Sequence, residues 1–226
     1  MVGLLLGCFA YAFPGAVACS LVDYAALDKL SDGTRFQSSS TLAERAAFSA
    51  LLRQASARIA DKFGAPRAHP VVVYLKDPHS TLPFISNSYG STSFIGSRAC
   101  VVLGPDGFNI DVIAHEMMHA ELFERVGFWA KLTQVPVWFD EGLAMQLDTR
   151  AHFAVQASDR AADFKRVREL TSASQFFVSN GSQLTQHYAF AKAEVGLWVE
   201  MVGKDTVYVR LARLKAGDSF ERVIEP

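Results

Sequence analysis

The chain alternates between stretches with helical periodicity and short β-branched runs, and this pattern predicts its first elements. In residues 42–63 the apolar side chains recur at three- and four-residue spacing, which predicts a packing helix, and Thr41 and Glu44 form a capping-box pattern at its start. Residues 70–75 and 98–103 are short apolar runs rich in Val, which predict two buried strands.

The second half of the chain is helical in pattern almost throughout. We expect a helix from about residue 109 to Gly127 and another at 135–145, where Pro136 suits a helix start. Further helical segments are expected at residues 160–170, 184–202, 206–215 and 220–224. This order of elements predicts an α+β fold, with a helical N-terminal piece, a small mixed sheet and a mainly helical C-terminal half.

Residues 80–97 are rich in Ser, Gly, Asn and Thr and lead into the second predicted strand. Two structures fit such a segment: an edge strand beside a site, or an ordinary surface loop. An exposed edge strand can bind an extended peptide through main-chain hydrogen bonds.

The first 22 residues carry no charged side chain. An apolar block is broken by Pro-Gly and followed by an A-x-A box that ends at Ala18, which is the pattern of a secretory signal peptide. We therefore predict a leader over residues 1–18 and a single domain over 19–226. A lipoprotein leader modified at Cys19, a short membrane anchor and an N-terminal buried helix are the alternatives. The signal peptide, the lipoprotein leader and the membrane anchor each predict export, to the periplasm, the medium or a membrane tether.

Composition argues against nucleic-acid binding and against a zinc site made of cysteines. Half of the 226 residues are hydrophobic and 17 are Phe, which is enough to form a hydrophobic core. The formal net charge of −1 gives no positive potential that would attract nucleic acid. The three cysteines form no C-x-x-C, which excludes a cysteine zinc cluster. Cys19 and Cys100 can pair in an oxidising compartment, although the apolar surroundings of Cys100 favour an unpaired buried cysteine.

The helix predicted after residue 109 contains the candidate chemistry, H-E-x-x-H at residues 115–119. Residues four apart lie on the same helix face, so His115 and His119 can reach one metal ion. Glu116 lies about 100° around the helix from His115, close enough to act beside the ion without binding it. Two imidazoles and a carboxylate that accepts a proton from water are the parts of a zinc hydrolase.

A catalytic zinc ion usually has three protein ligands, so a third is needed. Glu141, 22 residues after His119 on the next predicted helix, is the preferred candidate, and Asp140 and His152 are the alternatives. Glu121 is excluded because it points about 200° away from His119 on the same helix.

H-E-x-x-H at 115–119 followed by W-F-D-E-G-L-A at 138–144 resembles the gluzincin zinc peptidases, in which a downstream Glu in a W-x-x-E-G-x-A-like stretch completes the site. The chain is similar in particular to the small peptidase MA-like domains related to the aminopeptidase N catalytic domain, over about residues 70–224. The resemblance implies a zincin-like fold with an active-site helix, and Zn²⁺ as the cofactor.

The resemblance also implies roles for individual residues. It implies one general base and acid, Glu116, and three zinc ligands: His115, His119 and Glu141. Tyr188 is implied as hydrogen-bond donor to the oxyanion of the reaction, with His187 as second choice. The alternative for Tyr188 is an aromatic residue that packs against the core.

The chain also departs from the family's pattern. No G-x-M-E-N-like exopeptidase segment precedes the metal helix, so an aminopeptidase is not indicated. The spacing from His119 to Glu141 is longer than in aminopeptidase N-like enzymes, Asp140 replaces an Asn, and Met145 stands where thermolysin-like enzymes have an Asp. Three carboxylates remain candidates for orienting the zinc ligands through hydrogen bonds: Asp111, Asp140 and Asp148.

The predicted function is that of an exported zinc metallopeptidase, which hydrolyses peptide bonds of a peptide or protein substrate with Glu116 as general base. The alternative is a non-catalytic domain that binds zinc for stability or for a partner. The presence of Glu116 argues against this alternative, because a structural zinc site has no use for that carboxylate.

Overall fold

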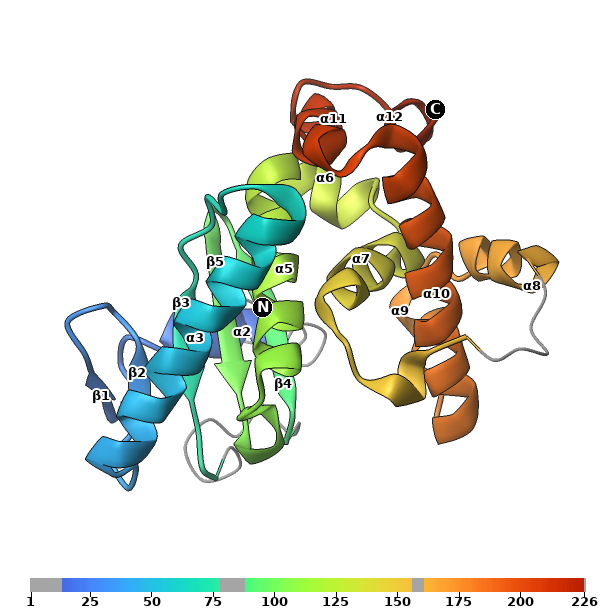
Figure 1. Ribbon diagram of the computed structural model, residues 1–226. Coiled ribbons are helices and arrows are strands. Elements are labelled where there is room, and N and C mark those ends of the chain that lie inside the picture. The colour runs from blue at the N-terminus through green and yellow to red at the C-terminus, as the bar shows by residue number, and fades with distance from the viewer. Residues whose placement is uncertain (1–13, 78–87, 156–160, 226) are drawn as a thin grey trace, which may run out of the picture. The chain divides into compact units, whose positions relative to one another are not determined.

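The computed structural model describes residues 14–77, 88–155 and 161–225, which divide into two compact units (Figure 1). One unit comprises the described residues up to Ala55 and between Ala68 and Ala120, and the other Ser56–Arg67 and the described residues from Glu121 onwards. The prediction of a single metallopeptidase domain over 19–226 stays a prediction. Residues 1–13 of the predicted leader lie outside the described residues.

A five-stranded mixed sheet forms the centre of the first unit. Its order is β1-β2-β3-β5-β4, where β2, β3 and β5 are parallel and the edge strands β1 and β4 are antiparallel to their neighbours. The strands are β1 (Leu27–Lys29), β2 (Arg35–Gln37), β3 (Val71–Tyr74), β4 (Gly90–Ile95) and β5 (Arg98–Leu103). The α+β class and the small mixed sheet are thus confirmed. In the segment 80–97, the part that is described forms the edge strand β4.

Helices lie on both faces of this sheet (Figure 1). Successive strand residues point to opposite faces of a sheet, and two neighbouring residues of β3 accordingly contact helices on opposite faces. Val73 packs with Ala18 of helix α2 (Pro14–Leu21). The next residue, Tyr74, stacks on Phe48 of helix α3 (Leu42–Phe63), with ring centroids 5.0 Å apart. Helix α5 (Ile110–Val126) contacts β4 from the α3 side, through a hydrogen bond described below.

The predicted capping box at the start of α3 is present. The Thr41 amide donates to Glu44 Oε2 at 2.7 Å, and the Glu44 amide donates to Thr41 Oγ1 at 3.2 Å. Lys76 also pairs with the Glu44 carboxylate at 2.9 Å. The hydrogen bond from Lys76, followed by those from Thr41, lowers the pKa of Glu44 to about 2.

A lowered pKa in the folded state makes the contribution of Glu44 depend on pH. The contribution is complete above the unfolded pKa of 4.5 and is lost as the pH falls from there towards 2. We expect wild type to be more stable than Glu44→Gln at pH 7, with the difference vanishing near pH 2. Chemical denaturation of both proteins across this range measures it, and a difference that persists unchanged at pH 2 would contradict the assignment.

The second unit is helical. Its elements are α6 (Phe128–Thr133), α7 (Val137–Ala144), α8 (Ala161–Arg166), α9 (Ala173–Phe176), α10 (Gly181–Val202), α11 (Val207–Lys215) and α12 (Phe220–Ile224). Helix α7 packs closely on α10: a Cβ on Gly142 would lie 2.5 Å from the Ala191 carbonyl oxygen, so only Gly fits there. The rings of Phe139 and Trp198 meet beside this contact, with centroids 5.1 Å apart.

The N-terminal part of the described chain is fixed to the sheet by a disulfide between Cys19 of α2 and Cys100 of β5. The expectation that Cys100 is unpaired is therefore wrong, and the pairing alternative holds. The predicted leader boundary falls inside α2, where both Ala18 and Cys19 are buried. Among the described residues, no helix is long and apolar enough to cross a membrane.

Loss of this disulfide is expected to destabilise the protein, because the bridge closes a long loop between residues 81 apart in the sequence. A disulfide of this kind contributes about 2–4 kcal/mol. We expect Cys100→Ser to lower the free energy of unfolding by that amount in urea titrations. Addition of a reductant should destabilise wild type and leave Cys100→Ser unchanged. Equal stability of the two proteins under oxidising conditions would contradict the assignment.

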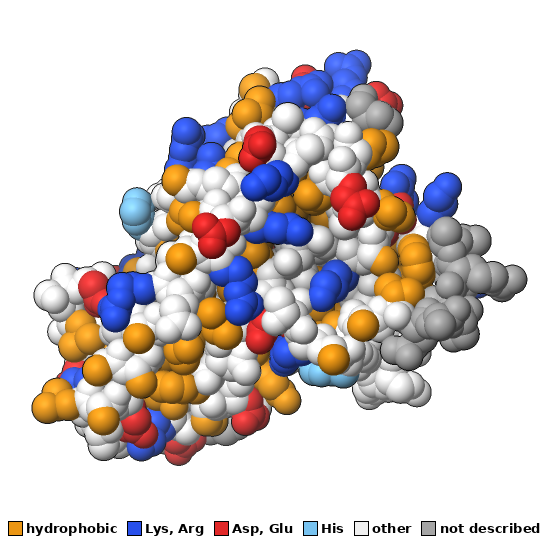
Figure 2. All heavy atoms as spheres, in the orientation of Figure 1, with side chains coloured by type: hydrophobic (Ala, Val, Ile, Leu, Met, Phe, Trp, Pro, Cys, Tyr) orange, Lys and Arg blue, Asp and Glu red, His pale blue; other side chains and the backbone are white. Residues whose placement is uncertain are grey.

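Basic and acidic side chains are interspersed over the face of the molecule shown in Figure 2. This distribution agrees with the formal net charge of −1.

Candidate metal centre

Helix α5 positions the H-E-x-x-H residues as their spacing predicts. The helix begins where the Asn109 side chain accepts a hydrogen bond from the Asp111 amide at 2.8 Å. One turn later, the Nε2 atoms of His115 and His119 face each other at 3.1 Å, with the two rings nearly perpendicular at 82°. Both imidazoles are buried. One helix turn thus presents two nitrogen donors side by side.

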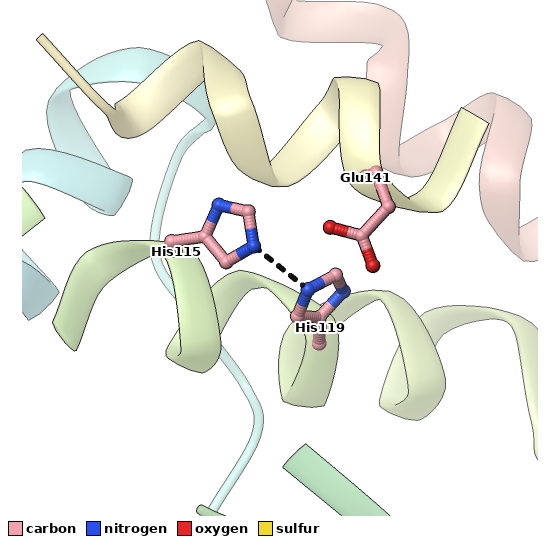
Figure 3. A group of neighbouring side chains, drawn as sticks. All are labelled: His115, His119 and Glu141. Atoms are coloured by element: carbon pink, nitrogen blue, oxygen red, sulfur yellow. Dashed lines mark hydrogen bonds between the residues drawn. The ribbon is translucent and has the colours of Figure 1, made fainter. Parts of the chain in front are cut away.

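Glu141 lies with these histidines in a group of three side chains that could hold a metal ion (Figure 3). It lies on α7, and one ligand atom from each of the three residues lies within 4.8 Å of the others. All three side chains are buried.

The geometry of this group fits a zinc ion. Two imidazole nitrogens bound to one tetrahedral zinc at 2.0–2.1 Å lie about 3.3 Å apart, and the distance between the Nε2 atoms of His115 and His119 is 3.1 Å. Two imidazoles and one carboxylate are also the donor set of many catalytic zinc sites. The donor types and the spacing of the two histidines therefore fit a zinc ion.

The alternatives for the third ligand lie elsewhere. The carboxylate of Asp140, next to Glu141, forms an ion pair with Lys131 of α6 at 2.5 Å. His152 is exposed, and its ring stacks on Phe153 with centroids 4.0 Å apart. Of the three candidates, Glu141 is the one that the structure groups with the two histidines.

Glu116 lies against the edge strand β4. The hydroxyl of Thr92 is 2.8 Å from Oε2 of Glu116 and 2.9 Å from its carbonyl oxygen, so it can donate its one proton to either acceptor. A Cβ on Gly90 would lie 2.9 Å from Cγ of the same glutamate. Glu116 is therefore a buried carboxylate held beside an edge strand, one residue from a metal-ligand candidate.

Tyr188 lies in the first half of α10, in an aromatic cluster. Its ring packs edge-on against Phe153 and Phe176, with centroids 5.5 and 5.2 Å away. Nδ1 of His187 is 2.8 Å from the carbonyl oxygen of Phe176. This packing is what the alternative for Tyr188 expects, and a role of the hydroxyl in catalysis stays a prediction.

The carboxylates proposed to orient the ligands differ in their contacts. Both oxygens of Asp148 accept hydrogen bonds from Arg150, which makes this buried group the acid of a local ion pair. Asp140 pairs with Lys131. Asp111 is buried in the first turn of α5.

Two buried acids have structural partners that sequence reasoning did not predict. Glu121, which is fully buried, accepts hydrogen bonds from Arg125 Nε at 2.6 Å and from the Arg67 amide at 2.8 Å. Arg125 lies over the ring of Tyr208, whose phenol has its pKa raised by burial. The second acid, Glu194, is described next.

Glu194 of α10 is buried and pairs with Arg168 at 2.6 Å. The helical pattern of residues 160–170 predicts a solvated face for Arg168, together with Arg160, Lys165 and Arg166. Arg168 is exposed, as this pattern predicts, and its guanidinium also neutralises the buried carboxylate of Glu194. Arg160 lies outside the described residues.

Comparison of the chain with protein-family models, with characterised proteins and with solved structures gives no match.

Proposed function

We propose that the protein is a zinc metallopeptidase with a zincin-like fold, in which His115, His119 and Glu141 bind zinc and Glu116 is the general base. The observation that carries the proposal is the grouping of the three ligands, which are separated by up to 26 residues in sequence, with their donor atoms within 4.8 Å. Glu116 follows directly after one of these ligands on the same helix.

A zinc ion held by these residues would lower the pKa of a bound water and polarise a substrate carbonyl. Glu116 then accepts a proton from the attacking water and passes it to the leaving amine. Its place on α5 suits this role, because it lies about 100° around the helix from His115 and therefore beside the ion rather than on it. The hydroxyl of Thr92 further limits where its carboxylate can lie.

Strand β4 supports a peptide as the substrate. It is an edge strand, paired with β5 alone among the described strands, and its inner face contacts Glu116 through Thr92. A peptide that adds to such an edge forms main-chain hydrogen bonds, which do not depend on its side chains. An extended substrate bound along β4 would run past the carboxylate that acts on the attacking water.

The disulfide supports the export of the protein. Disulfides form and persist in oxidising compartments and are rare in the cytosol, and Cys19 and Cys100 are paired. Export with residues from Pro14 onwards retained agrees with the packing of α2 on the sheet.

The non-catalytic alternative requires a closed site, because structural zinc usually has four protein ligands. Among the described residues the group contains three. A site with three ligands leaves a position for water, which supports catalysis over a purely structural role.

Metal removal tests the proposal. The purified protein is incubated with a peptide library before and after treatment with a chelator, and then after addition of one equivalent of zinc. We expect cleavage that is lost with the metal and restored by zinc. Circular dichroism before and after chelation shows whether the fold survives. Cleavage that is unaffected by complete metal removal would contradict the proposal, as would unfolding on chelation in a protein that cleaves nothing.

A further inference from the structure

The face of β4 that contacts helix α5 packs directly against the side chain of Glu116. Gly90 and Thr92 are two residues apart on this strand, so they point to the same face. Both face Glu116. The hydroxyl of Thr92 donates a hydrogen bond to its carboxylate, and Gly90, which has no side chain, leaves room for it. Ser93, the next residue, points to the opposite face, where it lies close to Gly15 of α2.

Gly90 leaves the space that Glu116 occupies. A Cβ at this position would lie 2.9 Å from Cγ of Glu116, 3.3 Å from its Cδ and 2.9 Å from Cδ2 of Leu103. Real Cβ atoms do not approach other atoms so closely, so one of the neighbours would have to move. The φ angle of Gly90 is not positive, so this space, rather than the backbone conformation, accounts for the glycine.

Thr92 provides the polar contact with Glu116 on this face of β4. Its hydroxyl has one proton and lies within hydrogen-bond distance of two acceptors, Oε2 and the carbonyl oxygen of Glu116. The distance to Oε2, 2.8 Å, is the shorter of the two, and a carboxylate oxygen is a stronger acceptor than a backbone carbonyl, which favours donation to Oε2. This bond fixes one carboxylate oxygen and leaves Oε1 to accept a proton.

We propose that Thr92 is a positioning residue for the general base, and that Gly90 provides the space in which Thr92 holds Glu116. The inference rests on the proposed function. It goes beyond that function because it assigns to the substrate-binding strand a second task, which is to orient the base. A base held in one rotamer needs no reorganisation when the water approaches, and misplacement by about 1 Å costs roughly a hundredfold in rate.

The test compares Thr92→Val, which keeps the shape and removes the hydroxyl, with Thr92→Ser, which keeps the hydroxyl. We expect Val to lower kcat about 10- to 100-fold, with KM, zinc content and Tm close to wild type. Ser should keep kcat within about threefold of wild type. Thr133→Val, which makes the same change at an exposed threonine of α6, is the matched control and should keep wild-type kcat.

A second variant approaches the same carboxylate from the other side. Gly90→Ala should lower kcat because its Cβ displaces Glu116, whereas Gly181→Ala, which has open space around it, should not. A Thr92→Val protein with wild-type kcat would overturn the inference. Parallel loss of kcat, zinc and Tm in both Thr92→Val and Gly90→Ala would also overturn it, since a structural role then explains the result. If wild type itself cleaves nothing, the proposed function fails instead.

Discussion

Glu116→Gln is expected to abolish peptide hydrolysis while zinc stays bound. Gln has the shape of Glu and its side-chain oxygen can still accept the hydrogen bond from Thr92, but the amide cannot take a proton from water. Loss of general base catalysis lowers the rate about 10²- to 10⁴-fold. The measurement pairs kcat on the best peptide from the library with zinc content by elemental analysis.

Glu124→Gln is the matched control. Glu124 is an exposed acid on the same helix, so its neutralisation should change neither kcat nor zinc content. Full cleavage by the Glu116→Gln protein would contradict the assignment of Glu116 as the base. Loss of zinc in that variant would indicate instead that Glu116 is a ligand.

His119→Ala is expected to lose both zinc and hydrolysis. A structural zinc site with four ligands contributes about 10–16 kcal/mol, so that one ligand accounts for about 3 kcal/mol, or roughly a hundredfold in affinity. Competition with a chromophoric chelator measures the zinc affinity of each variant. Glu141→Gln should weaken binding to a similar degree, because it removes the carboxylate that the structure groups with the histidines.

Asp140→Asn provides the control for Glu141→Gln, since the two acids are neighbours on α7. The Asp140 carboxylate pairs with Lys131, so its loss should leave zinc affinity within a few fold of wild type. If Asp140→Asn lost zinc and Glu141→Gln kept it, the third ligand would be Asp140 and the grouping observed here would be wrong.

Long elements with clear boundary residues could be predicted from the sequence, and short ones could not. The capping box of Thr41 and Glu44 and the apolar spacing after it gave the correct range for α3. Strands β1 and β2 have three residues each, which is too short for an alternating pattern to appear. Pairing of β2 with β3 joins Arg35 to Val73, a contact that no local pattern encodes.

The same distinction applies to the site. His115 and His119 could be predicted as a pair because the helix alone sets their relation. The third ligand depends on tertiary structure, which is why sequence spacing left Asp140 and His152 open beside Glu141. Thr92 was missed because its bond to Glu116 joins a strand and a helix 24 residues apart in the chain, and its sequence context, a Ser- and Thr-rich strand, carries no sign of it. The Cys19–Cys100 bridge was likewise one of two open alternatives.

The central claim is that one zinc ion is bound by His115, His119 and Glu141. X-ray absorption spectroscopy of the zinc-loaded protein, combined with zinc stoichiometry, tests it most directly. The account predicts one zinc per chain, with two imidazole nitrogens and two oxygens in its first shell, one from the carboxylate and one from water. It also predicts that zinc binding is lost in a protein that carries His115→Ala and His119→Ala together. A protein that binds no zinc, or a spectrum unchanged by the double substitution, would contradict it.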